Sequence, residues 1–302
     1  MTVSASRILK ARPPEPSEPL TDPGLAVCLC SAFFGHYAHA GFLTGLHERG
    51  IEPGRIAGCS GGAIAGGLWA AGVRGEELEK ILHSIRFKRA FFDLGAFWRF
   101  LGVVTWSYSS GVLCGARMER YLTRLLGDLR MEECDPKIEI AVANLTRGRG
   151  EIRDRGLLRD FIIASFSMPL IYRPRTIEGE QFLDGGVSNG TPFDHWLDDP
   201  AIHTILVHRI QYAGDRKPSR GPGSVLTGCH SITWHELFER RRKEAEASGK
   251  RVLFVETTAQ PLGIFHGRSA HAHFILGKAT AEACSERMAS SSAANSARFA
   301  TR

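Results

Sequence analysis

The sequence contains no long uninterrupted apolar run and no export signal. Its first twenty residues hold four prolines and lack the apolar segment of a signal peptide. The longest apolar-rich stretch, residues 85–106, is interrupted by five charged side chains, which are too many for a membrane span. We therefore expect a cytoplasmic protein without a transmembrane span, for which peripheral association with a membrane surface stays open.

Paired cysteines and nucleic-acid motifs are also missing. The 7 cysteines form no CxxC motif and no cysteine/histidine ladder with metal-ligand spacing, so a reduced setting is favoured over a disulfide framework. The net charge of +6 suits an anionic surface, but no nucleic-acid motif accompanies it, and we expect no nucleic-acid partner. Nothing in the sequence identifies a protein partner.

Short apolar runs that alternate with helical patterns predict a parallel α/β sheet. Residues 25–30 are typical of a strand buried on both faces, and residues 36–49 carry apolar side chains at helical spacing. A second strand and helix follow at 55–57 and 63–71, and this order implies parallel pairing. The remaining candidates are strands at 137–145, 203–210 and 251–256, helices at 118–126 and 157–166, and a long loop at 212–224.

Ser60 lies in a run of small residues that fits the G-x-S-x-G pattern between a strand and a helix. Such a tight turn brings backbone segments close together, so the flanking Gly58 and Gly62 avoid clashes. The hydroxyl would project at the helix N-terminus, where positive charge stabilises a developing alkoxide. This arrangement is a nucleophile elbow, although the same pattern also occurs in ordinary glycine-rich turns.

Asp184 is the candidate general base. It ends an apolar strand and precedes Gly185 and Gly186, whose flexibility would let the carboxylate approach another loop closely. Partial burial could raise its pKa toward a useful base strength. Without the serine elbow, the same residues would be read as a hairpin turn.

The loop after the first strand is the candidate oxyanion hole. Its donors would be the backbone amides of Ala32, Phe33, Phe34 and Gly35, between a strand and a helix N-terminus. The alternative interpretation is an ordinary loop whose aromatic side chains cover the core.

Together and in this order, these pieces resemble the patatin-like phospholipase family of serine acyl hydrolases. The resemblance covers about residues 25–208 and includes HAGFLTGLHERGIEPGRIAG before the elbow, SSGVLCGARMERYLTRLLG, and ASFSMPLIYRPRTIEGEQFLDGGVSNGTP around the acid. It implies a three-layer α/β fold in which helices flank a central, mostly parallel sheet.

The resemblance further implies a Ser60/Asp184 dyad that cleaves carboxylic esters of lipids through a covalent acyl-enzyme, without histidine. This chemistry requires no metal and no organic cofactor. The chain departs from the family in its oxyanion loop, where most of the expected glycines and the basic residue are missing. That departure concerns the rate more than the fold.

On this basis we expect four segments. Residues 1–23 would be a disordered proline-rich tail, 24–212 the patatin-like acyl hydrolase domain, 213–288 its C-terminal α/β extension, and 289–302 a disordered tail.

Two other functions stay open. An ordinary α/β-hydrolase could combine Ser60 and Asp184 with His203, His208 or His230 in a triad. A catalytically silent lipid-binding or scaffold protein would explain the irregular oxyanion loop.

Two further stretches call for an interpretation. Residues 85–108 mix aromatic and basic side chains, which suits a lid or a docking surface for anionic interfaces. Amphipathic helices that pack these aromatics on the sheet are slightly favoured. The histidines at 266, 271 and 273 suggest a metal site, but no carboxylate or cysteine follows at suitable spacing, so a helix with polar positions is favoured.

Overall fold

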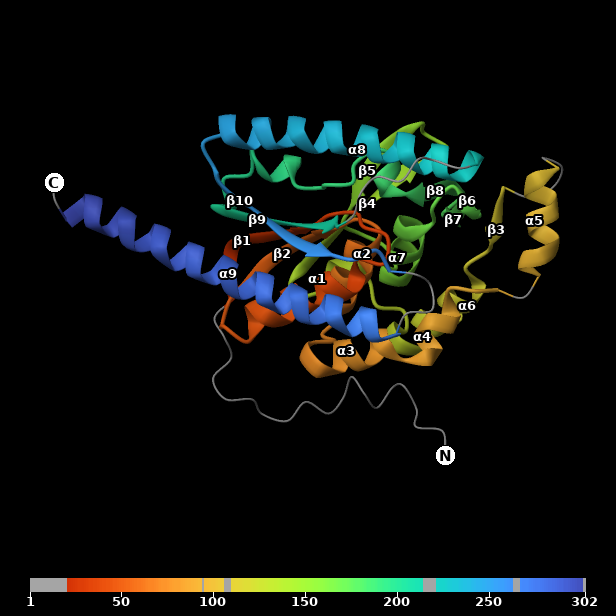
Figure 1. Cartoon of the computed structure of the whole chain (residues 1–302), viewed down its shortest axis with the longest axis horizontal. Helices are drawn as coiled ribbons and strands as arrows, with labels where there is room; N and C mark the ends of the chain where they lie inside the picture. Colours follow the sequence, from red (N-terminus) through yellow and green to blue (C-terminus); the bar gives the residue numbers. More distant parts are fainter. Residues whose placement is uncertain (1–20, 94, 106–109, 214–220, 263–266, 301–302) are drawn as a thin grey trace.

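The computed structural model describes residues 21–93, 95–105, 110–213, 221–262 and 267–300. They form a central sheet with helices on both faces, in three layers (Figure 1). Helix α8 (Pro222–Ala247) covers one face, and α1 (His36–His47) and α9 (Gly267–Ala300) lie over the other. The predicted fold class is confirmed.

The sheet is mostly parallel, in the order β10-β9-β1-β2-β4-β8-β7, and β5 pairs with β4. Strands β10, β9, β1, β2 and β4 run parallel to their neighbours, whereas β5, β7 and β8 are antiparallel. A separate small sheet holds β3 and β6. The bounds are β1 Thr21–Leu29, β2 Glu52–Gly58, β3 Gly111–Leu113, β4 Lys137–Asn144, β5 Arg149–Arg153, β6 Leu170–Tyr172, β7 Arg175–Ile177, β8 Glu180–Asp184, β9 Thr204–Tyr212 and β10 Arg251–Ala259.

The other described helices lie between β2 and β6 in the chain. They are α2 Gly61–Ala70, α3 Gly75–His83, α4 Ile85–Ala90, α5 Ala96–Val104, α6 Ala116–Leu126 and α7 Leu158–Phe166, with short 3₁₀ turns at Met131–Glu133, Gly185–Val187 and Asp194–Trp196. No helix within the described ranges is long and apolar enough to cross a bilayer.

Strand β1 is buried on both faces, as its apolar run predicts. Val27 and Leu29 belong to the hydrophobic cluster beneath α1 and α2. Ala26 and Cys28, which alternate with them, belong to a second cluster with Phe238 of α8. Because successive side chains of a strand point to opposite faces of the sheet, β1 contributes to both hydrophobic clusters.

The predicted strands and helices all occur, with ends that differ by a few residues. One difference concerns the first expected tail and another the predicted loop at 212–224. Strand β1 begins at Thr21, which pairs with Glu52, so it includes residues expected in the first tail. Part of the predicted loop at 212–224 lies outside the described residues, and α8 begins within it at Pro222.

Helix α9 continues to Ala300, through most of the segment 289–302 that the sequence analysis expects as a second tail. This segment contains no glycine or proline and is rich in alanine, the strongest helix former. Extension of an existing helix also avoids the unfavourable nucleation step.

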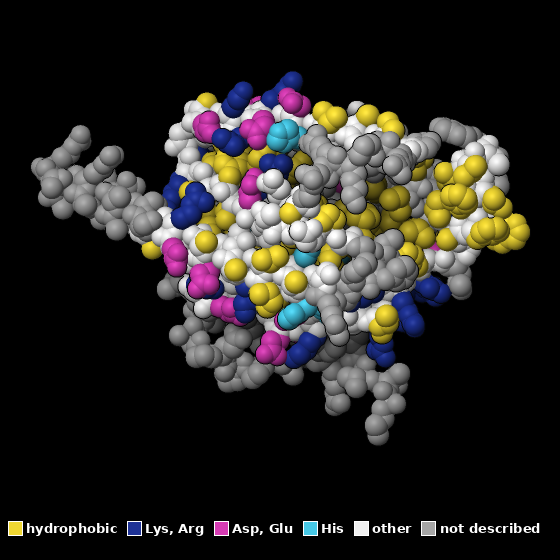
Figure 2. All heavy atoms as spheres, viewed as in Figure 1, with side chains coloured by type: hydrophobic (Ala, Val, Ile, Leu, Met, Phe, Trp, Pro, Cys, Tyr) yellow, Lys and Arg dark blue, Asp and Glu magenta, His cyan; other side chains and the backbone are white. Residues whose placement is uncertain are grey.

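The aromatic stretch is only partly packed inside, contrary to the favoured prediction. Phe87 of α4 is fully buried, but Phe97 and Trp98 of α5 are 67% and 66% exposed. Figure 2 shows apolar side chains gathered at the end of the molecule where α5 lies in Figure 1. Trp106 lies outside the described residues. Helix α5 therefore presents an uncovered apolar face.

Candidate active site

Ser60 stands at the sharp turn between β2 and α2. Its backbone has φ 54° and ψ −116°, a region that residues with side chains rarely occupy. A Cβ atom on Gly58 would lie 2.6 Å from the Gly62 carbonyl oxygen, and one on Gly62 would lie 2.1 Å from the Leu29 carbonyl oxygen. Both glycines therefore stand where close backbone approach excludes a side chain.

Ser165, which the sequence did not single out, fixes this turn. Its buried hydroxyl on α7 accepts a hydrogen bond from the Ser60 amide at 2.9 Å. The same hydroxyl donates to the Ala141 carbonyl oxygen of β4 at 2.7 Å. Ser165 thus ties the elbow to the neighbouring strand.

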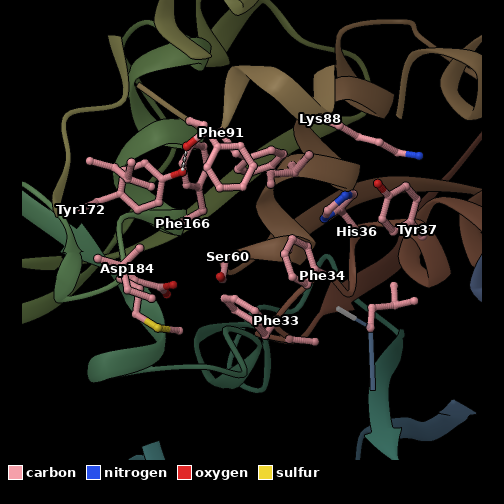
Figure 3. A pocket seen from close by; sticks show the side chains of 18 of the residues that line it. Phe33, Phe34, His36, Tyr37, Ser60, Lys88, Phe91, Phe166, Tyr172 and Asp184 are labelled. Atoms are coloured by element: carbon pink, nitrogen blue, oxygen red, sulfur yellow. Dashed lines mark hydrogen bonds between the residues drawn. The ribbon is translucent and has the colours of Figure 1, made fainter. Parts of the chain in front are cut away.

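Asp184 ends β8 and faces Ser60 across a cavity that both residues line (Figure 3). Its Oδ1 accepts hydrogen bonds from the Gly186 amide at 2.8 Å and from the Cys59 thiol at 3.8 Å. A Cβ atom on Gly185 would lie 2.3 Å from the Ala141 carbonyl oxygen, so this glycine lets the acid loop pack against β4.

Burial changes the acid–base behaviour of Asp184. Its side chain is 4% exposed, and desolvation raises its pKa from the ordinary 3.8 to about 6. Hydrogen bonds from the Gly186 amide and from the side chains of Ser60 and Cys59 lower the pKa and offset part of this rise. The carboxylate is consequently a stronger base than an exposed aspartate, and it is still mostly ionised at pH 7.

Ser60 opens into a cavity of about 500 Å³, a volume typical of small-molecule sites. Most of its walls are apolar or aromatic. At one side lie Lys88 and Arg89 of α4, and Figure 3 shows Lys88 far from Asp184. Other lining residues include Phe33, Phe34, His36, Tyr37, Ile64, Phe91, Phe166, Met168, Tyr172 and Leu262.

The candidate oxyanion loop also borders Ser60. The Gly35 amide donates to the Ala32 carbonyl oxygen at 3.0 Å, so it is already used within the loop. Within the described parts of the chain, the amides of Ala32, Phe33 and Phe34 have no hydrogen-bond partner. Phe34 has φ 56°, a conformation that favours glycine. Phe34 therefore adopts a backbone conformation that glycine usually occupies.

The histidines proposed for a triad lie elsewhere. His208 is fully buried and contacts His39 and Thr257, and His203 contacts Asp22 at the opposite end of the strands. The side chain of His230 lies outside the described residues. Among the described side chains, His36 is the histidine that lines the cavity, and burial lowers its pKa to about 3. It makes no contact with Asp184, and no triad forms among these residues.

Comparisons with known proteins identify related sequences. Lysophospholipase NTE1 of Cryptococcus neoformans is 25% identical over 229 residues, which are 75% of this chain and 14% of that protein. Lysophospholipase NTE1 of Eremothecium gossypii is 30% identical over 181 residues, or 60% and 11% of the two chains. The chain thus spans between a tenth and a seventh of the length of these relatives.

Among solved structures, VipD of Legionella pneumophila is similar with a TM-score of 0.45 at 12% identity. The match covers 88% of this chain and 66% of VipD. The sequence model described as patatin-like phospholipase matches residues 27–196, more than half of the chain, from the first strand through the acid loop. The chain therefore belongs to the patatin-like phospholipase family.

Proposed function

We propose that the protein hydrolyses carboxylic esters of phospholipids or lysophospholipids through Ser60 and Asp184. The observation that carries this proposal is the strained serine at a helix N-terminus, which shares one apolar cavity with a buried carboxylate of raised pKa. Membership of the patatin-like phospholipase family supports the same chemistry.

In the proposed reaction, the Ser60 hydroxyl attacks the ester carbonyl while Asp184 accepts its proton. The backbone amides of Ala32, Phe33 and Phe34 stabilise the oxyanion, and the N-terminus of α2 adds positive charge. When the intermediate collapses, Asp184 returns the proton to the leaving alcohol and an acyl group stays on Ser60. Water, activated by Asp184, then releases the fatty acid and restores the serine.

The cavity walls favour an amphipathic substrate. An acyl chain would bury its surface against Phe91, Phe166 and Ile64, and each buried methylene contributes about 0.8 kcal/mol. Lys88 and Arg89 place positive charge at the wall of the same cavity. They make no ion pair within the part of the chain that the structure describes, so they can face a lipid phosphate. A phosphate-bearing ester fits these walls better than a neutral one.

The uncovered face of α5 supports action at a lipid surface. Phe97, Trp98 and Val104 are 58–67% exposed, and the basic residues Arg86 and Arg89 lie on the preceding α4. Exposed aromatic residues next to cations are typical of segments that bind anionic membrane interfaces. We propose that α5 docks on the membrane from which the lipid enters the cavity.

A serine-directed fluorophosphonate probe and a panel of lipid esters test the hydrolase assignment. Wild type should bind the probe covalently and cleave phospholipid or lysophospholipid faster than triacylglycerol. Ser60→Ala and Asp184→Asn should lose hydrolysis, whereas the surface variant Ser248→Ala serves as a matched serine control and should retain it. Unlabelled wild type, or equal hydrolysis by Ser60→Ala, would disprove the assignment.

A further inference from the structure

A cluster of one carboxylate and two imidazoles joins α3 to α9, outside the cavity that holds Ser60. Glu79 and His83 lie one turn apart on α3, and His271 reaches them from α9. One candidate ligand atom from each of the three lies within 4.8 Å of the others. The carboxylate missing near His271 in the sequence is thus supplied by a residue 192 positions away.

His83 is oriented as metal-ligating histidines usually are. Its Nδ1 lies 2.9 Å from the Glu79 main-chain carbonyl oxygen, so Nδ1 carries the proton and donates it. Nε2 is then the unprotonated nitrogen, and it is buried without a hydrogen-bond partner in the described structure. A ring nitrogen that donates to a carbonyl leaves the other nitrogen free to bind a metal.

The other two side chains already form a hydrogen bond, in which Nδ1 of His271 lies 2.8 Å from Oε1 of Glu79. A divalent cation could take the place of the hydrogen in this contact and bind both atoms. Tetrahedral zinc, with bonds near 2.0–2.1 Å, places neighbouring ligand atoms roughly 3.3 Å apart. His271 is 60% exposed and can rotate to close the remaining gap.

We propose that Glu79, His83 and His271 form a zinc-binding site that links α3 to α9. Two imidazole nitrogens and one carboxylate oxygen suit Zn²⁺, with water as a fourth ligand, whereas Mg²⁺ and Ca²⁺ prefer oxygen ligands alone. None of the three residues lines the cavity that holds Ser60, so the site takes no part in the proposed Ser60/Asp184 reaction.

The position of the site gives the metal a structural role. Ala270, next to His271, lines the cavity, and so does Ile85, two residues after His83. Zinc would therefore hold the α9 wall of the cavity against the segment that joins α3 to α4. Ligand binding to the folded state alone raises stability, so zinc should stabilise this junction.

Zinc binding to an untagged chain tests the site. Because Cys229 is the exposed one among the described thiols, Cys229→Ser is the reference protein. Equilibrium dialysis with ZnCl₂ should give one tightly bound zinc per chain. Zinc at about 100 times its dissociation constant should raise the Tm by several degrees, and MgCl₂ should not.

His271→Ala and Glu79→Gln, each made in the reference protein, should weaken zinc binding by more than about tenfold and abolish the Tm increase. His195→Gln is the matched control, because His195 pairs with Glu139 and no third candidate ligand lies beside them in the described ranges. It should bind zinc like the reference. His271 and Glu79 lie at the surface, so a Tm measured without metal verifies folding. Equal zinc affinity in His271→Ala and the reference would overturn the proposal.

Discussion

Ser60 is held in a conformation that its own side chain disfavours. Backbone strain of this kind costs about 1–3 kcal/mol and persists only where the surroundings enforce it. Here close backbone contacts at Gly58 and Gly62 and the hydrogen bond from the Ser60 amide to Ser165 enforce it. These contacts hold Ser60 in the conformation in which it lines the cavity.

Ser165→Ala should therefore reduce turnover although Ser165 touches no substrate. The change leaves the buried Ser60 amide without an acceptor, which costs about 1–3 kcal/mol, and frees the elbow to relax. We expect kcat and the rate of fluorophosphonate labelling to fall at least tenfold while KM changes little. The control is Ser167→Ala, because that buried hydroxyl bonds only the Ile163 carbonyl among the described residues. Equal loss in both variants would indicate general destabilisation instead.

Ionisation of the buried Asp184 carboxylate should lower the stability of the folded protein as pH rises, although the ionised form is the catalytic base. Its pKa is about 6 in the folded state against an ordinary 3.8, so its contribution to stability is full below about pH 4 and is lost as pH passes 6. A difference of this size corresponds to about 3 kcal/mol. The stability of Asp184→Asn relative to wild type should thus increase from pH 4 to pH 7, as measured by urea denaturation.

The hydrolytic activity of wild type should instead increase as pH rises. Its kcat/KM should rise as pH passes 6, because the ionised carboxylate is the base. A stability difference between the two proteins that does not vary with pH would contradict the raised pKa.

These residues also show what a sequence can predict. Ser60 and Asp184 can be proposed from the sequence because each belongs to a local pattern with a steric reason, glycines at a tight turn or a strand end. Ser165 and Glu79 carry no such pattern. Each acts on a residue more than 100 positions away, through a contact that only the folded chain creates.

Elements were predicted well where burial sets their periodicity, and less well where it does not. Strand β1 has one long apolar run, and its two buried faces follow directly. Helix α5 is rich in aromatic residues, but composition does not reveal whether a partner covers them. In the structure they face outward.

Docking through α5 predicts a specific loss in the double variant Phe97→Ser/Trp98→Ser. Burial of a large apolar side chain contributes about 1.5–3 kcal/mol, so binding to anionic vesicles should weaken at least tenfold. Cleavage of a soluble short-chain ester should stay unchanged, because neither residue lines the cavity. Vesicle co-sedimentation measures the binding.

The matched control is Val225→Ser/Ile232→Ser, which removes two apolar side chains that are 51% and 54% exposed on α8. It should bind vesicles like wild type. Equal binding by the α5 double variant and wild type would exclude α5 as the docking element.

At the scale of the whole molecule, a buried hydrogen-bond chain joins the sheet to the α1/α9 layer. His39 of α1 bonds the Cys30 carbonyl oxygen through Nε2, so its Nδ1 accepts from Nδ1 of His208 on β9. Nε2 of His208 then accepts from Thr257 of β10, which contacts Thr280 of α9. Burial lowers the pKa of both histidines, so both imidazoles stay neutral. The donor and the acceptor in each histidine hydrogen bond are therefore fixed.

Glycines let α1 and α9 approach each other closely enough for these hydrogen bonds to form. A Cβ atom on Gly41 would lie 1.9 Å from the Phe274 carbonyl oxygen, and one on Gly277 would lie 2.1 Å from the Ala38 carbonyl oxygen. Since backbone atoms cannot rotate away as side chains can, any larger residue must push the helices apart.

Gly41→Ala should consequently lower the Tm and expose α9 to trypsin. A Cβ atom only 1.9 Å from a backbone oxygen places the overpacking penalty toward the upper end of about 1–3 kcal/mol, above the stabilisation of about 1 kcal/mol that alanine brings to a helix. Gly45→Ala, one turn along the same helix, is the graded comparison, because its nearest neighbours lie at 2.7 and 3.0 Å. It should destabilise less than Gly41→Ala. If Gly41→Ala instead matches wild type in Tm and protease resistance, close backbone contact does not hold α9 in place.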